Sequence, residues 1–133
     1  MKKQVNEWLR HAKIDLFSAK KLLEDEFLTQ SVAFHTHQAI EKSFKAIIED
    51  RGKRIPRIHD LEKLYGLIQE LGINLNWIDE DILTQINDVY IDSRYPADVG
   101  LIPEGIPSLK KVIKFYELSE KIYENVLELL EGK

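Results

Sequence analysis

The stretch HTHQAIEKSFKAII, residues 35–48, decides the fold, because it lacks glycine and proline and its residue types repeat at a helical period. At about 100° per residue, its bulky apolar side chains and its small side chains occupy two arcs. The bulky arc holds Ile40, Phe44 and Ile47, and the small arc holds Ala39, Ser43 and Ala46. A helix that is apolar around more than half of its circumference must be covered from two sides. We therefore predict that this is the central helix of a bundle.

A third arc of the same helix is polar. It presents carboxamide, carboxylate and ammonium groups from Gln38, Glu41, Lys42, Lys45 and Glu49, and is called the polar arc below. We expect it to remain open as a groove whose functional groups are anchored on a packed element.

Apolar spacing and end signals predict helices on either side of this stretch. The expected helices cover roughly residues 3–25, 30–51, 60–71, 79–95 and 108 to the end. Asp60 and Ser108 are predicted N-caps, whereas Gly52 and Gly72 are predicted stops. No strand signal or internal repeat is present. The prediction is one all-α domain over residues 1–133, an antiparallel bundle of about five helices.

Composition limits the class of protein. The 133 residues are 44% hydrophobic and include no cysteine, which excludes disulfides and thiolate metal sites. The N-terminus lacks the apolar segment of a signal peptide and no long apolar run is present, so we expect a cytoplasmic protein without a membrane partner. The net charge of −4 disfavours a general nucleic-acid coat protein but leaves room for a local basic site.

Two groups of cations are candidate anion-binding elements. Residues 51–57 form a basic turn, which contains Arg51, Lys53, Arg54 and Arg57. With Lys42 and Lys45 these cations could bind phosphate, or they could simply be solvated and favour the C-terminal end of the helix. Arg94 and Tyr95 precede Pro96, where the arginine could reach into the groove or saturate carbonyls at the helix end.

The histidines suggest acid–base or metal chemistry less directly. His59 at a helix start could act as a general acid or base, or could be structural. His11 with Asp15 and His37 with Glu41 have i,i+4 spacing, which ion pairs explain as well as a metal does. The Glu-x-x-His pattern of di-iron bundles and the glycine-rich phosphate loop are both missing. We predict neither a metal nor a cofactor.

The chain resembles the HEPN family, the higher-eukaryote and prokaryote nucleotide-binding domains. The resemblance rests on HQAIEKSFKAII at 37–48, IHDLEKL at 58–64 and SRYP at 93–96, in the family's order. It implies a compact helical bundle that commonly forms homodimers. Many prokaryotic members are small and are encoded beside a minimal nucleotidyltransferase, in toxin–antitoxin-like pairs. By position, the family's functional residues correspond to Gln38, Glu41, Lys42, Lys45, His59, Arg94 and Tyr95.

Other members of the family are metal-independent RNases, and here the sequence departs from their pattern. Those members carry an arginine and, after four to six residues, a histidine, but the corresponding positions after Arg94 are Val99, Gly100 and Leu101. Arg54 and His59 have the spacing but lie across the turn that contains Pro56. We therefore predict a nucleotide- or phosphate-binding module, with an RNase that uses His59 together with Arg54 or Arg94, or a non-catalytic interaction scaffold, as alternatives.

Overall fold

The computed structural model describes residues 1–94 and 106–132. The described chain folds into five α-helices and one 3-10 turn, and these residues include no strand. The elements are α1 (Lys3–Leu22), η1 (Glu26–Leu28), α2 (Thr29–Asp50), α3 (Leu61–Glu70), α4 (Glu80–Arg94) and α5 (Leu109–Glu131). The predicted all-α bundle of five helices is confirmed.

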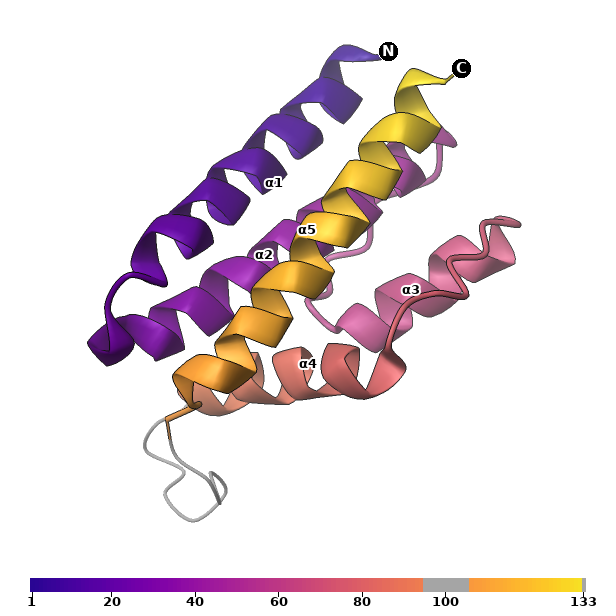
Figure 1. The fold of residues 1–133 in the computed structure, drawn as a ribbon. Helices are drawn as coiled ribbons and strands as arrows, with labels where there is room; N and C mark the ends of the chain where they lie inside the picture. The colour runs from indigo at the N-terminus through magenta and orange to yellow at the C-terminus, as the bar shows by residue number, and fades with distance from the viewer. Residues whose placement is uncertain (95–105, 133) are drawn as a thin grey trace.

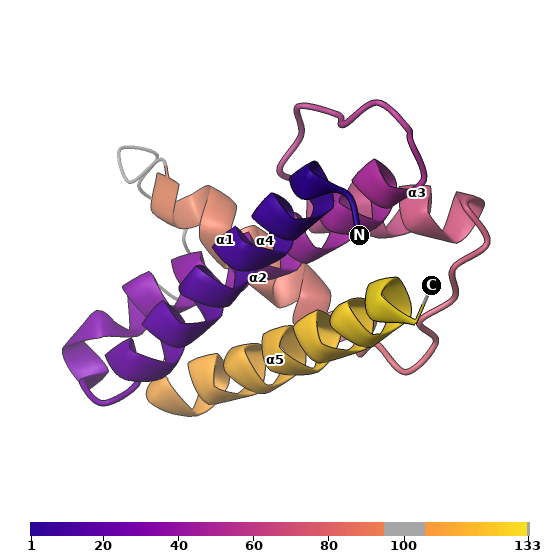
Figure 2. The ribbon, with the colours of Figure 1, turned by 90° about the horizontal axis from the view of Figure 1, so that it is seen from above.

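Helix α2 is the centre of the bundle, as its two apolar arcs predict. It contacts each of the other four helices (Figure 1). The long helices α1 and α5 run beside it, and the shorter α3 and α4 pack on its remaining side (Figures 1 and 2). The start of α1 and the end of α5 lie near each other at one end of the bundle in both views.

Local signals set the helix boundaries. The side chain of Asp60 accepts hydrogen bonds from the backbone of Glu62 and Lys63, and the side chain of Ser108 accepts one from the backbone of Lys111. Asp79 caps α4 in the same way. The stops at Gly52 and Gly72 have φ values of 68° and 85°, which favour glycine because it has no Cβ. Helix α1 ends about three residues earlier than predicted, because η1 starts the connection to α2.

The side chains of both arcs of α2 lie in the core of the bundle. Phe44, Ile40 and Ile47 are fully buried, as are the small residues Ala39 and Ala46. None of the described helices has the length and hydropathy needed to cross a membrane.

The expectation of an open polar arc is wrong for its two central residues. Glu41 and Lys45 are only 4% and 5% exposed. Trp8 of α1 lies against the Lys45 ammonium, and His59 from the segment after α2 lies against the Glu41 carboxylate. Sequence periodicity places residues on a helical face, but it does not show which other segments cover that face.

Candidate functional site

The buried carboxylate of Glu41 joins the Lys45 ammonium and the His59 imidazole. Its Oε2 accepts a hydrogen bond of 2.9 Å from Lys45 Nζ, and its Oε1 lies 3.0 Å from His59 Nδ1. An ionised carboxylate can only accept, so Nδ1 of His59 carries the hydrogen. The His59 side chain is 50% exposed, whereas that of Glu41 is 5% exposed. Glu41 therefore fixes the buried side of the imidazole through Nδ1, and Nε2 remains available for a ligand or a proton.

A second buried carboxylate organises the neighbouring part of the polar arc. Asp15 of α1 lies 2.8 Å from His35 Nδ1 and accepts a 2.6 Å hydrogen bond from Lys42 Nζ. Burial would raise the pKa of Asp15, but the hydrogen bonds from His35 and Lys42 outweigh burial and lower it below its ordinary value. The Lys42 side chain is 22% exposed. This carboxylate thus fixes a partly exposed ammonium at the edge of α2.

An aromatic stack connects α2 to α4 beside these networks. The ring of His37 stacks on Tyr90 with a centroid distance of 3.7 Å and an interplanar angle of 9°. Phe34, which is 40% exposed, lies 5.9 Å from the same tyrosine ring. Burial lowers the pKa of His37 to about 4, an effect that the nearby Glu41 only partly offsets. His37 is consequently a neutral core residue.

Arg94 and Tyr95 cannot be placed by their side chains, which lie outside the described residues. The backbone of position 94 ends α4, one helical turn after Tyr90. The Tyr90 ring lies 6.2 Å from that of His59, so position 94 is one turn from a residue in contact with the Glu41 network.

The basic turn does not join the polar arc as a single cluster. Arg51 donates a 3.0 Å hydrogen bond to the carbonyl of Leu71. Arg54 and Lys53 line a separate cavity of about 350 Å³ together with Glu70 of α3. His59 is the residue after the turn that reaches α2.

Only one of the two i,i+4 pairs of metal-ligand type stays together in the structure. His11 Nε2 lies 3.8 Å from Glu7, whereas Asp15 contacts His35 and Lys42. Among residues 1–94 and 106–132, no group of three or more histidine and acidic side chains could hold a metal ion. His37 and Glu41 lie 3.8 Å apart as an ordinary i,i+4 contact.

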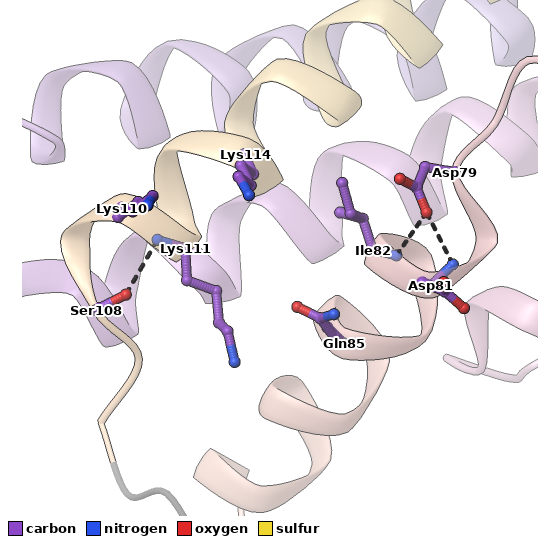
Figure 3. A pocket seen from close by; sticks show the side chains of 8 residues that line it. All are labelled: Asp79, Asp81, Ile82, Gln85, Ser108, Lys110, Lys111 and Lys114. Carbon is purple, nitrogen blue, oxygen red and sulfur yellow. Dashed lines mark hydrogen bonds between the residues drawn. The ribbon is translucent and has the colours of Figure 1, made fainter.

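A lysine-rich cavity that the sequence analysis did not single out lies between the starts of α4 and α5 (Figure 3). Its volume is about 440 Å³, and Lys110, Lys111 and Lys114 line the α5 side. Asp79 and Asp81 line the opposite side, where Asp79 caps α4. The sequence signal for this cavity is the start of α5, which carries three lysines in its first six residues and has no acidic residue in its first turn.

The family model for the HEPN domain matches residues 5–130. The chain belongs to the HEPN domain family. Two solved structures share the fold of this HEPN domain, each with a TM-score of 0.70 and 23% sequence identity. The first is ST0689, an archaeal HEPN homologue, over 97% of this chain and 98% of that one.

The second structure is TT1696 from Thermus thermophilus, which is similar over 96% of this HEPN domain and 98% of that chain. No curated protein matches the sequence. At this level of identity the two structures support the fold, and the chemistry of the site must be argued from this chain's own residues.

Proposed function

We propose that this HEPN domain binds a nucleotide or another phosphate-bearing ligand along the polar arc, acting as a homodimer with a minimal nucleotidyltransferase partner. The observation that carries the proposal is a pair of partly exposed donors, each fixed by a buried carboxylate. Asp15 holds Lys42, and Glu41 holds His59. Donors fixed before binding lose little conformational entropy when an anion arrives, which favours affinity.

The hydrogen-bond donors that these two groups do not use within the protein suit a phosphate. An ammonium has three N–H donors, of which Lys42 uses one toward Asp15. Nε2 of His59 points away from the hydrogen bond that Nδ1 makes with Glu41, and donates when the ring is protonated. Phe34 offers a partly exposed aromatic ring near this surface, on which a base can stack.

Gln38 provides a further argument for a polar ligand. Its Oε1 is buried and, although it lies near the His37 ring, makes no hydrogen bond of good geometry among the described residues. A buried acceptor without a partner is unfavourable, so a ligand that donates to it gains binding energy. Arg94 and Tyr95 complete the proposed set of contacts at this site. Arg54 lines a separate cavity, so its proposed contact is with a part of the ligand that extends beyond the polar arc.

Calorimetric titration with ATP, GTP and UTP, alone and with the partner, tests this function. We expect saturable heat with at least one nucleotide, and a loss of about tenfold in affinity for Lys42→Ala, for His59→Ala and for Arg94→Ala. Lys63→Ala, which removes an exposed lysine of α3, is the matched control. Absence of heat with every nucleotide under both conditions would contradict the proposal.

A metal-independent RNase is the second candidate, and the His59–Glu41 pair favours it. A carboxylate that fixes one ring nitrogen leaves the other aligned as a general base for a ribose 2′-hydroxyl. Cleavage of tRNA or mRNA in EDTA, lost in both His59→Ala and Arg94→Ala, is the expected result for this activity. Cleavage that persists in both variants would show that these residues are not its catalytic groups.

A further inference from the structure

A pocket between α1 and α2 lies beside the polar arc and has a different chemistry. Its volume is about 390 Å³, and it is called the α1–α2 pocket; its lining residues are Gln4, Glu7, Trp8, His11, Lys42 and Glu49. The lining combines an indole ring with two carboxylates. We propose that the α1–α2 pocket binds a guanidinium group, carried by a free small molecule or by an arginine side chain.

The charges around the α1–α2 pocket favour a cation. Lys42 is the only lysine or arginine among its lining residues, and its ammonium is paired with Asp15 at 2.6 Å. The nearby Lys45 is paired with Glu41 at 2.9 Å. The charges of both ammonium groups are thus balanced by carboxylates outside the pocket, and the carboxylates of its own lining give it a net negative potential.

The carboxylates of the α1–α2 pocket are weakly engaged. Glu7 lies 3.8 Å from His11, and its side chain is 50% exposed. Glu49 accepts a long hydrogen bond of 3.4 Å from Trp8 Nε1. Glu49 also belongs to the last turn of α2, where the helix macrodipole adds negative potential. That turn itself contains no basic residue, and the Lys2 ammonium donates to the Asp50 carbonyl rather than to Glu49. Each carboxylate can accept further donors.

The indole ring gives the α1–α2 pocket its preference for a planar cation. The Lys45 ammonium already lies 5.8 Å from the centroid of the Trp8 ring, so the electrostatics of this ring attract positive charge. A guanidinium stacks on an aromatic face and presents parallel N–H groups that match a carboxylate. An alkylammonium is a hydrated point charge and cannot do both.

This inference does not depend on the proposed nucleotide site, although Lys42 borders both. A nucleotide requires Lys42 and His59 as donors, whereas a guanidinium requires Glu7 and Glu49 as acceptors. If the nucleotide titration fails, the guanidinium titration still tests the α1–α2 pocket, and the reverse also holds.

Fluorescence of Trp8 provides a direct test. The protein contains two tryptophans, so the titrations use a Trp77→Phe background in which Trp8 is the sole reporter. We expect a saturable change with ethylguanidinium at about pH 8, where histidine is ordinarily neutral. Glu7→Gln and Glu49→Gln should each weaken binding by about tenfold, because each removes a charged acceptor.

The matched control is Glu24→Gln, which removes an exposed carboxylate just beyond the C-terminal end of α1, whereas the pocket lies along the N-terminal half of that helix. Its affinity for ethylguanidinium should be unchanged. No saturable change, equal binding by both lining variants and the parent, or equal binding of butylammonium would each overturn the proposal. Because the two glutamates are substituted separately, one variant that does not fold still leaves the other as a test.

The source of the guanidinium is resolved by a second probe. Acetyl-Gly-Arg-Gly amide is titrated beside ethylguanidinium under the same conditions. Tighter binding of the peptide supports an arginine side chain of a protein partner, and tighter binding of ethylguanidinium supports a free small molecule.

Discussion

The cations of the polar arc and those of the basic turn place different demands on the rest of the protein. Lys45 is buried and Lys42 half-buried, and each ammonium pairs with a carboxylate. Arg51 and Arg54 are exposed, and Arg51 uses a backbone carbonyl. A cation removed from water must be compensated, whereas an exposed cation is already solvated. Positively charged residues are therefore important for the stability of the fold on α2, whereas those of the basic turn can be replaced with little loss of stability.

The largest effect should come from breaking the Glu41 network. Glu41→Gln leaves the Lys45 ammonium buried without a carboxylate, and we expect a loss of about 4 kcal/mol in the free energy of unfolding. Urea denaturation monitored by circular dichroism measures this change. Glu62→Gln, at an exposed position on α3, should change it by less than about 0.5 kcal/mol.

A double substitution sharpens the same test. Replacing both Glu41 and Lys45 with methionine removes the buried charges together, so the double variant should be more stable than Glu41→Gln. Equal denaturation midpoints for Glu41→Gln and the parent protein would show that this pair is not electrostatically important.

The next effect concerns pH and the neutral core histidine. The folded-state pKa of His37 is about 4, below the ordinary histidine value of 6.5. Between these two pH values the histidine is protonated in the unfolded chain and neutral in the folded protein. Stability should be fully present above pH 6.5 and fall by about 3 kcal/mol as the pH decreases toward 4. Urea denaturation across this range measures the slope.

His37→Phe should flatten that slope, because it keeps an aromatic ring stacked on Tyr90 and removes the titrating group. Asp15 acts at lower pH, since its lowered pKa means that its stabilising contribution disappears only as the carboxylate is protonated. An unchanged slope between pH 6.5 and 4 in His37→Phe would contradict the assignment.

The smallest effect on stability is expected in the basic turn. Arg54→Ala removes an exposed side chain from a surface cavity, so the free energy of unfolding should change by less than about 0.5 kcal/mol. Thermal denaturation measures this difference. A loss comparable to that of Glu41→Gln would remove the distinction between the two groups of cations.

Helix boundaries were predictable because their causes are local. Asp60 and Ser108 each accept from backbone groups two or three residues ahead, and Gly52 and Gly72 supply the positive φ at helix ends. The apolar arcs of α2 likewise identified the central helix, since a side chain's angular position follows from residue number alone.

The candidate site was predictable as a set of residues but not as a set of contacts. The sequence indicated Glu41, Lys45 and His59, yet it provided no reason to expect that one carboxylate holds the other two. The spacing also suggested His11 as a neighbour of Asp15, whereas the structure pairs His11 with Glu7.

The sequence by itself determined the helices, their caps and the identity of the residues on each face of α2. Only the tertiary structure decided which charges meet, because the partners of Asp15 lie 20 and 27 residues away and come from another helix. It also decided that Trp8 covers Lys45 and that His59 covers Glu41, the two central residues of the polar arc. Such contacts depend on how separate segments pack, and periodicity within one helix carries no information about them.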